Sequence, residues 1–463
     1  MAGGGFTPIA NGEIPIMVWP HAGRYNRCDN EAVDSQQKPT MQDTSQIHVN
    51  LTAVEHNLRL LRGIVGPQCG ICPVLKADGY GLGATQIAKH LVHAGANMLA
   101  VHTLAQAAQL ARAAVGGPIL VLMPVYEIDR LNEAYRLLIC GRLHLSVHDH
   151  DHLARLSAIA EQFATVIPLH LEVDTGMSRA GCEPQAVGPL IERIAASRWL
   201  RMAGLSTHFA NARAPSASTN RQLEIFDGLL EQYQSLLEPE CVIHAANTFA
   251  TLRHQRFHKS MVRVGLAWAG FGPECMSGGV FRIRARELRP VITWTSRLVN
   301  VKTIEAGTSV GYGSSWTAAR RTRIGLVPVG YADGLPMALG ATDRHPKPAC
   351  LGIDVGGEAD GCGLQYVPVI GQVNMDQITV DLTDLSGADS IGVGAPVQLI
   401  GTDPAAPNHL PTLARSAGTI PHEILCRLSP RIRRVYHATC MADRDPAPAP
   451  VPANTPGPAP VAV

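Results

Sequence analysis

The stretch ICPVLKADGYGLG (residues 71–83) decides how this 463-residue chain folds. Its first half is a short apolar run typical of a buried parallel strand, and its second half is a turn rich in glycine. Seven more apolar runs follow, and helical patterns such as TQIAKHLVHAGA (85–96) and NRQLEIFDGLLEQYQSLL (220–237) separate them. These runs are NMLAVH (97–102), PILVLM (118–123), LHLSVH (143–148), PLHLEVD (168–174), AGLSTHF (203–209), VIHAAN (242–247) and MVRVGL (261–266).

The alternation of eight strands with helices predicts a (β/α)8 barrel over residues 45–285, with its active site at the carboxyl ends of the strands. A doubly wound open sheet is the alternative, but no G-x-G-x-x-G phosphate turn follows the first strand. Beyond about residue 285 helical patterns largely vanish, and runs such as TRIGLVPVGYA (322–332) and GAPVQLIG (394–401) indicate strands. The predicted fold class is therefore α/β, an N-terminal (β/α)8 barrel followed by a C-terminal β-rich domain at 286–440.

The two ends of the chain carry no pattern of folded structure. Residues 1–44 predict a flexible extension, and residues 441–463 form a Pro/Ala-rich tail that predicts disorder. The sequence starts without the basic and apolar regions of a signal peptide, and no apolar run approaches the roughly 18 residues of a membrane span. The chain is therefore expected to be cytoplasmic. Its formal net charge of +1 gives no attraction for nucleic acid or an anionic membrane, so neither is expected as a partner.

Eleven scattered cysteines indicate mostly free thiols in a reducing compartment. The pair Cys69 and Cys72 has the spacing of a redox motif, but it lies at the start of a strand and lacks the helix N-terminus that activates a thiol. We therefore expect these two cysteines to be inert. No metal is among the expected cofactors.

Polar residues at the predicted strand ends are the candidates for chemistry, because a barrel brings these ends together. Lys76 ends the first strand, and only six lysines occur in the whole chain. An amine at this place could bond covalently to an aldehyde cofactor, although a lysine after a strand is more often an ordinary surface residue. Later strand ends carry Arg179, His208, Asn247, Thr248, Arg263 and Gly265. Each alone has an ordinary structural interpretation, but together they favour a functional one.

Nine motifs, spread in order over about residues 45–438, resemble those of the alanine racemase family. They are VLKADGYGLG (74–83), LEVDTGMSRAG (171–181), STHFANA (206–212), AANT (245–248), VRVGLAWAGFGP (262–273), SVGYGSSWTA (309–318), LVPVGYADGLP (326–336), VPVIGQVNMDQITVDLTD (367–384) and GTIPHEILCRLSPRIRRVY (418–436). One such motif is weak evidence, whereas nine in order are specific for the family, though not for the substrate.

The resemblance implies a pyridoxal 5′-phosphate cofactor and a head-to-tail homodimer with composite active sites. Lys76 would hold the cofactor covalently and act as the base on one face of the substrate α-carbon. Tyr312, contributed by the partner subunit, would be the base on the other face, because racemisation needs one group to remove a proton and an opposed group to return one. The other implied cofactor ligands are Tyr80, His208, Asn247, Thr248, Arg263, Gly265, Leu266 and Tyr331. The implied substrate ligands are Arg179, Met375 and Asp376.

Arg263 has a particular role in the family that this sequence resembles, where the matching arginine donates to the pyridine nitrogen of the cofactor. An arginine does not give up its proton. The ring nitrogen would therefore stay largely unprotonated and the ring would be a weaker electron sink. The resemblance also implies that His208 hydrogen-bonds to Arg263 and to Tyr312, which would lower the pKa of Tyr312.

Three residues depart from the family pattern. Glu172 occupies the position where many members have a carbamylated lysine, and we expect its carboxylate to pair with Arg179 directly or through a bridging water or anion. A solvated glutamate is the alternative. Ala269 replaces a usual aromatic residue and Pro430 replaces a tyrosine of some members, so the pocket is expected to tolerate amino acids larger than alanine.

Two other function classes stay open on the sequence alone. A decarboxylase or another lyase on the same type of barrel generally has a carboxylate at the ring nitrogen, so Arg263 argues against it. A non-catalytic, cofactor-binding barrel would have little use for Lys76, Tyr312 and a complete second domain.

Overall fold

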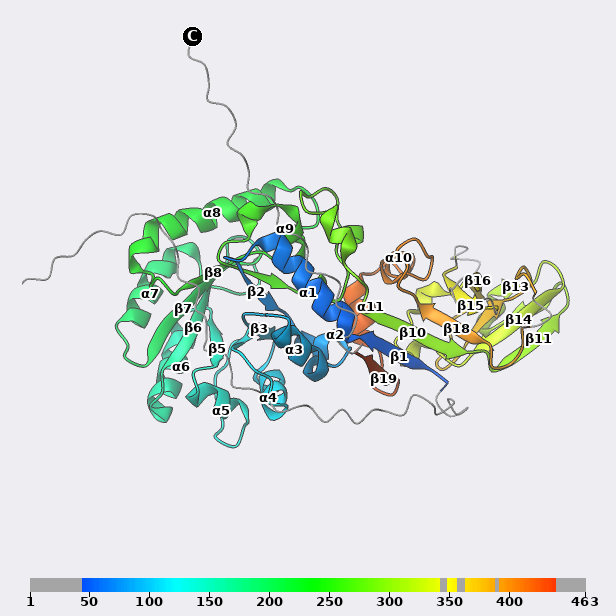
Figure 1. The fold of residues 1–463 in the computed structure, drawn as a ribbon, viewed down its shortest axis with the longest axis horizontal. Coiled ribbons are helices and arrows are strands. Elements are labelled where there is room, and N and C mark those ends of the chain that lie inside the picture. Colours follow the sequence, from blue (N-terminus) through cyan, green and yellow to red (C-terminus); the bar gives the residue numbers. More distant parts are fainter. Residues whose placement is uncertain (1–43, 342–347, 356–362, 388–390, 439–463) are drawn as a thin grey trace, which may run out of the picture.

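The computed structural model describes residues 44–341, 348–355, 363–387 and 391–438. The predicted extension before residue 44 and the predicted tail at 441–463 lie outside these ranges. Within them the chain forms a barrel and an elongated β-domain (Figure 1). No described helix is both long and apolar enough to cross a membrane.

Eight parallel strands form the barrel, in the order β2-β9-β8-β7-β6-β5-β4-β3. They are β2 Gly70–Pro73, β3 Leu99–Val101, β4 Ile119–Val121, β5 Leu143–Val147, β6 Ile167–Glu172, β7 Leu200–Ser206, β8 Val242–His244 and β9 Met261–Val264. Each of these strands overlaps one of the eight predicted runs. A parallel bridge between Val74 and Ala100 joins β2 to β3, so the barrel is nearly closed. The predicted (β/α)8 barrel is therefore confirmed.

Helices surround the barrel and bury their apolar faces against the strands (Figure 1). They are α1 Leu51–Val65, α3 Ala84–His93, α4 Leu104–Arg112, α5 Ala134–Ile139, α6 His150–Phe163, α7 Val187–Ala195, α8 Ala217–Tyr233 and α9 Thr248–Arg253. Side chains that cap the first turns fix several of these helix starts. Thr103 and Gln106 form a reciprocal capping box at α4, and Asp149 accepts from the backbone N–H of His152 at α6.

The second domain is built on a nine-stranded sheet in the order β11-β14-β17-β16-β15-β18-β10-β1-β19. Its strands are β1 Gln46–Asn50, β10 Ile292–Arg297, β11 Asn300–Ile304, β14 Thr322–Val327, β15 Cys350–Asp354, β16 Leu364–Ile370, β17 Ile378–Asp381, β18 Pro396–Ile400 and β19 Arg433–His437. A separate hairpin joins β12 Ser309–Val310 to β13 Trp316–Thr317. The predicted C-terminal β-rich domain is thus confirmed.

Two features of this domain differ from the sequence expectation. Strand β1, which precedes the barrel in sequence, pairs antiparallel with β10 and parallel with β19 and so belongs to the second sheet. Two short helices, α10 Leu410–Ser416 and α11 Pro421–Arg427, interrupt the strands. Pairing of strands more than 240 residues apart has no local sequence signature, which explains the first difference. Helix α11 lies at the junction between the barrel and the β-domain (Figure 1).

Candidate active site

The barrel strand β2 leads into a one-turn left-handed helix, α2 Lys76–Tyr80, that begins with the candidate lysine. Ala77, Asp78 and Tyr80 all have positive φ, between 53° and 57°, where a side chain costs roughly 1–2 kcal/mol per residue. Bonds from Gly79 N to Leu75 O (2.9 Å) and from Gly81 N to Ala77 O (2.8 Å) close the turn. Such strain persists only where surrounding contacts hold it, and it concentrates at functional sites.

Lys76 is the exposed first residue of this turn. Partial burial of its amine and the positive charge of Arg179 lower the pKa of Lys76, while Cys426 on α11 opposes the shift. A lysine with a lowered pKa has more of its neutral form, which is the form that reacts as a nucleophile or a base.

Tyr80 closes the turn and packs against residues that follow β9 and against His422 of α11. Its ring is 3% exposed, stacks on Trp268 at 5.6 Å between ring centroids, and meets His422 edge-on at 5.5 Å. Burial raises the pKa of Tyr80, so its hydroxyl stays a hydrogen-bond donor. A methyl group on Gly265 would lie 2.2 Å from this hydroxyl, so glycine is needed there for the two elements to approach.

Thr248 and the backbone after β9 form a group of donors beside Tyr80. The Thr248 hydroxyl oxygen accepts from the N–H of Gly265 (3.1 Å) and of Ala267 (3.3 Å), which leaves its own proton available to an anion. Asn247 is the N-cap of α9 and accepts from Ala250 N at 3.1 Å, which fixes Thr248 at the first helical position. Two hydroxyls brought close together by the glycine between them are suited to a phosphate.

Replacing Gly265 by alanine should displace the Tyr80 hydroxyl, because the new methyl group would overlap it at 2.2 Å. We expect the affinity for pyridoxal phosphate to fall about tenfold, as for the loss of one hydrogen bond to a charged group. Titration of apoprotein with pyridoxal phosphate, followed by absorbance, measures this. Gly228→Ala on α8, where nothing lies within 4 Å of the added methyl, is the matched control. Equal affinities of the two variants would contradict the expectation that the phosphate binds beside Tyr80.

Arg263 is a buried cation inside the barrel. Its Nη1 donates to His244 Nδ1 (2.5 Å) and to the carbonyl of His244 (2.9 Å), and its Nη2 donates to the carbonyl of Thr207 (2.7 Å). His208 Nδ1 lies 3.3 Å from the same Nη2. Of the two contacts expected for His208, the one with Arg263 is therefore present, whereas Tyr312 lies in the other domain.

A row of buried histidines extends from Arg263 into the barrel. His170 Nδ1 lies 2.8 Å from His244 Nε2, and His144 Nδ1 lies 2.9 Å from His170 Nε2. Because arginine only donates, His244 must accept at Nδ1 and donate from Nε2, and the same assignment passes to His170 and His144. The sequence pattern did not reveal this row, although the histidines in LHLSVH and LHLEVD stand at strand positions that the barrel makes neighbours.

The lowered pKa values of these buried histidines predict that acid destabilises the fold. Burial lowers the pKa of His144 and of His208 to about 3 and the pKa of His422 to about 4, and it lowers those of His170 and His244 well below the usual value. Between pH 6.5 and about 4 the unfolded chain binds protons at these sites and the folded chain does not. The free energy of unfolding must therefore fall with falling pH, by up to about 1.4 kcal/mol per pH unit for each histidine.

Urea unfolding at pH 7.5 and pH 5.5 measures this effect. The wild-type chain should lose roughly 1 kcal/mol per buried histidine over that interval. His144→Gln should show a smaller pH dependence than wild type, whereas the exposed His150→Gln should not. An unfolding free energy that is the same at the two pH values would contradict the neutral state assigned to these side chains.

Glu172, at the end of β6, has its closest ionisable contact with His148, whose Nδ1 lies 3.6 Å from Oε2. Burial raises the pKa of Glu172, and the charges of Arg263 and Arg179 oppose that shift. Arg179 is exposed and acts on the carboxylate electrostatically. In the next turn, Asp174 accepts from the N–H groups of three successive residues, which holds the loop that carries Arg179.

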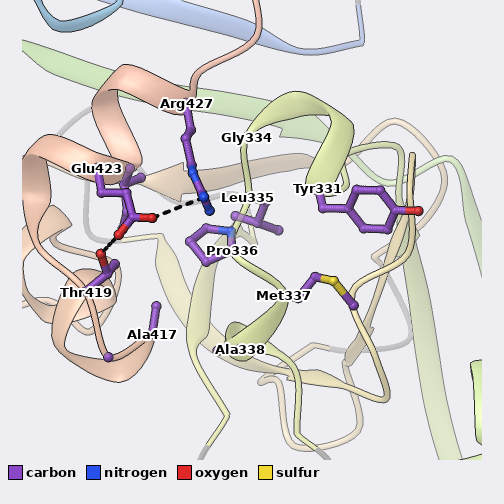
Figure 2. Close-up of a pocket in the computed structure, with 12 residues that line it drawn as sticks. Tyr331, Gly334, Leu335, Pro336, Met337, Ala338, Ala417, Thr419, Glu423 and Arg427 are labelled. Atoms are coloured by element: carbon purple, nitrogen blue, oxygen red, sulfur yellow. Dashed lines mark hydrogen bonds and ion pairs between the residues drawn. The ribbon is translucent and has the colours of Figure 1, made fainter.

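The other candidate residues lie in the second domain. Tyr312 is 71% exposed, Tyr331 42% and Met375 54%, and Asp376 is exposed as well. The hairpin beside Tyr312 lies far from the barrel (Figure 1). A cavity of about 690 Å³ borders Tyr331 and α11, and Figure 2 shows the Tyr331 ring pointing away from the helix. A single chain therefore places Lys76 and Tyr312 on separate surfaces.

The structure also shows the surroundings of the two spaced cysteines and of the substituted positions Ala269 and Pro430. Cys69 and Cys72 are buried and free, and burial raises their pKa values to about 11 and about 12, so both thiols are poor nucleophiles. Ala269 is completely buried in the core, beside Trp268, and Pro430 is exposed.

The fold and the site define a two-domain barrel protein whose mouth combines a strained lysine turn with donors for an anion. Models of the alanine racemase N-terminal and C-terminal domains match residues 49–273 and 291–436. The chain belongs to the alanine racemase family, a family of isomerases.

Individual relatives agree with this assignment. Alanine racemase of Cutibacterium acnes is 32% identical over 402 residues, which cover 86% of this chain and 99% of that protein. The crystal structure of alanine racemase from D-cycloserine-producing Streptomyces lavendulae matches with a TM-score of 0.74 and 29% identity, over 87% of this chain and 99% of that chain. The structure from Bartonella henselae, which holds covalently bound pyridoxal phosphate, matches with a TM-score of 0.69 and 25% identity, over 85% and 99%.

Proposed function

We propose that this chain interconverts L- and D-alanine with pyridoxal 5′-phosphate as cofactor, using Lys76 and Tyr312 as opposed bases. The observation that carries the proposal is the barrel mouth, where the strained lysine turn, the Tyr80 and Thr248 hydroxyls and the Arg263 guanidinium are brought together by the barrel strands. The family relationship supports the same reaction class.

The residues at the mouth fit this cofactor. Tyr80 and Thr248 offer hydroxyl donors to a phosphate, Gly265 allows their close approach, and Leu266 is buried in the core. Lys76 supplies the amine that would join the aldehyde. When bound, the cofactor withdraws electrons from the substrate α-carbon and so makes its proton acidic.

Arg263 sets the outcome of the reaction in this proposal. Four hydrogen-bonding contacts hold its guanidinium, and it offers an N–H to the cofactor ring without being able to transfer the proton. With the cofactor bound, such a donor would leave the ring nitrogen unprotonated, which would favour return of a proton to the α-carbon over its transfer elsewhere. This favours racemisation over a lyase reaction, the second enzyme class that such a barrel supports.

The proposed enzyme is a head-to-tail homodimer with composite sites. Tyr312, Tyr331 and Met375 are large side chains on the surface of the β-domain, where a monomer gains nothing from exposing them. Docking of this surface on the barrel mouth of a second copy would bring the partner's Tyr312 opposite Lys76 and the partner's Met375 and Asp376 to the substrate carboxylate beside Arg179. Analytical ultracentrifugation tests the dimer.

The alternative to an alanine-specific racemase is a racemase that also accepts larger amino acids. Pro430 is exposed, which is compatible with larger substrates, whereas the buried Ala269 does not line an open space. Incubation with L-lysine, L-arginine, L-serine and L-methionine, followed by chiral chromatography, separates the two forms. Turnover of alanine alone would restrict the enzyme to alanine.

The reaction itself is tested by incubating L-alanine with the holoenzyme in D2O. We expect D-alanine to appear with solvent deuterium at Cα, because the proton that returns comes from a second group that exchanges with solvent. Loss of carbon dioxide without inversion would instead indicate a lyase. Cofactor binding without any change in alanine would indicate a binding protein.

Glu172→Gln should lower kcat/KM about tenfold, because a half-buried negative charge that interacts electrostatically with Arg263 and Arg179 would be lost. Steady-state kinetics with alanine measures this. His148→Gln is the matched variant, since it removes the closest partner of Glu172 and leaves the carboxylate in place. Full activity of Glu172→Gln would contradict a role for the carboxylate in place of the carbamylated lysine.

A further inference from the structure

Residues 428–436, called here the return segment, lead the chain from α11 into β19 and contact the lysine turn. Arg434 donates from Nε and Nη2 to the carbonyl of Gly81, at 3.1 and 2.9 Å, and Gly81 ends the turn that begins with Lys76. The Tyr436 hydroxyl donates to the carbonyl of Leu82 at 3.0 Å. The left-handed turn, whose backbone is strained, is therefore held from outside by this segment.

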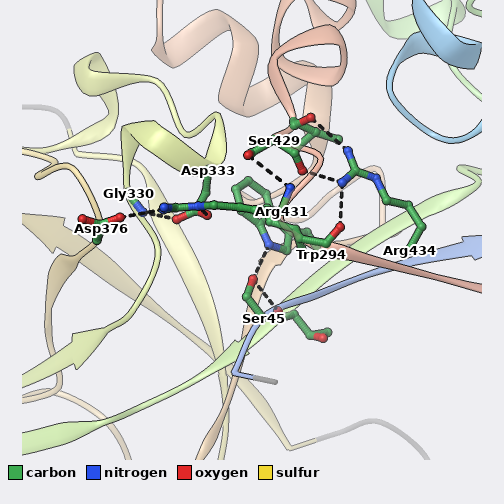
Figure 3. Close-up of polar contacts among 11 residues, drawn as sticks. Ser45, Trp294, Gly330, Asp333, Asp376, Ser429, Arg431 and Arg434 are labelled. Carbon is green, nitrogen blue, oxygen red and sulfur yellow. Dashed lines mark hydrogen bonds and ion pairs between the residues drawn. The ribbon is translucent and has the colours of Figure 1, made fainter. Parts of the chain in front are cut away.

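At its other end the return segment contacts loops of the β-domain through Arg431. Arg431 donates from Nε to Asp333 and from Nη2 to Asp376, each at 2.7 Å, and Figure 3 shows its guanidinium lying between the two carboxylates. Asp333 is only 8% exposed, so its charge needs this partner. The backbone N–H of Ser429 adds a bond to the carbonyl of Asp333 at 3.0 Å.

The two carboxylates belong to loops that carry proposed active-site residues. Asp376 follows Met375, and Asp333 follows Tyr331 by two positions. The loops are bonded to each other, from Tyr331 N to the carbonyl of Asn374 and from Ala332 N to the carbonyl of Met375, both at 3.0 Å. Arg431 thus ties together the loops that present Tyr331 and Met375.

The return segment is itself stiff between these two attachments. Arg434 donates to the carbonyls of Leu428 (2.9 Å), Ile432 (2.6 Å) and Ser429. Strand β19 then pairs in parallel with β1. The return segment is therefore held by its own hydrogen bonds between the two attachments, so that each arginine can act at its own end.

We propose that Arg431 and Arg434 are positioning residues that serve two different active sites of the dimer. Arg434 holds the lysine turn of the site in its own barrel, and Arg431 holds the Tyr331 and Met375 loops that the same chain lends to its partner's site. The return segment joins one half of each site. This rests on the proposed function, in which each site combines Lys76 of one chain with the partner's Tyr312.

Mixed dimers test this assignment. One chain carries Lys76→Ala and the other carries Tyr312→Phe, each with a different affinity tag, and two purification steps isolate the dimer that contains both. Only one site of this dimer is intact. It takes its lysine turn from the Tyr312→Phe chain and its Tyr312, Tyr331 and Met375 from the Lys76→Ala chain.

Arg431→Ala should lower kcat/KM for alanine about tenfold when it is placed on the Lys76→Ala chain, and less than about twofold when it is placed on the Tyr312→Phe chain. Arg434→Ala should show the reverse dependence on placement. Arg431→Lys, which keeps one charged contact, should recover part of the loss. Arg59→Ala, at an exposed ion pair with Glu55, should have no effect on either chain.

The possible outcomes distinguish a failure of the positioning role of Arg431 and Arg434 from a failure of the composite active site on which it rests. A parent mixed dimer without activity, when wild type is active, overturns the composite site and this proposal with it. An active parent in which Arg431→Ala acts equally from both chains overturns the positioning assignment alone and leaves the composite site standing. The positioning assignment is also overturned if Arg431→Ala acts only from the Tyr312→Phe chain and Arg434→Ala only from the Lys76→Ala chain.

Discussion

Lys76→Ala should reduce racemisation of alanine by roughly 10⁴-fold or more, because it removes both the covalent attachment of the cofactor and one of the two bases. The amine begins a strained left-handed turn, and its pKa is lowered by partial burial and by Arg179, so the wild-type lysine is prepared for both tasks. Chiral chromatography of alanine gives the rate. Lys89→Ala, an exposed lysine on α3, is the matched control and should keep wild-type activity.

A second measurement shows whether Lys76→Ala loses activity because the cofactor is no longer attached covalently. Borohydride treatment of the holoenzyme, followed by digestion and mass spectrometry, should add the mass of the cofactor to the peptide that contains Lys76. The same treatment of Lys76→Ala should leave all peptides unchanged. Labelling of another lysine in the wild-type protein would contradict the account of the turn.

Tyr312→Phe should reduce racemisation by about 10²–10⁴-fold, the usual contribution of one general acid or base. The ring is kept, so packing at the exposed position is unchanged and only the transferable proton is lost. Because L- and D-alanine have equal free energies, the rates must fall by the same factor in both directions. Tyr126→Phe, another exposed tyrosine, is the control.

Proton exchange identifies Tyr312 as a base more sharply than the rate does. In D2O the Tyr312→Phe enzyme should still exchange the α-proton of one enantiomer, through Lys76, without inverting it. Wild type should exchange and invert together. Loss of exchange for both enantiomers would show that Tyr312 has a structural task, and full racemisation would remove it from the mechanism.

The barrel was predictable from local sequence because each of its strands is a buried apolar run and most are followed by their own helix. The ends of the predicted strands singled out Lys76, Thr248 and Arg263 as candidates. In the folded chain Thr248 is bonded to Gly265, and Arg263 is bonded to His244.

Features that depend on distant pairing were beyond the sequence. Strand β1 looks like the start of the barrel but completes a sheet with β10 and β19, whose partners lie at the far end of the chain. The left-handed conformation of Ala77 and Asp78 could not be expected from residues that rarely adopt it. The histidine row has no sequence signature, because a single histidine in an apolar strand has an ordinary interpretation and only the barrel makes the histidines of β5, β6 and β8 neighbours.

The central claim is that the barrel mouth and the β-domain together racemise alanine with pyridoxal phosphate. The most direct measurement is chiral chromatography after the purified protein, supplied with pyridoxal phosphate, has been incubated with L-alanine. The account predicts D-alanine that rises until the two enantiomers are equal, and the same mixture when D-alanine is the starting material. L-Alanine that stays unchanged while the cofactor is bound to Lys76 would contradict it.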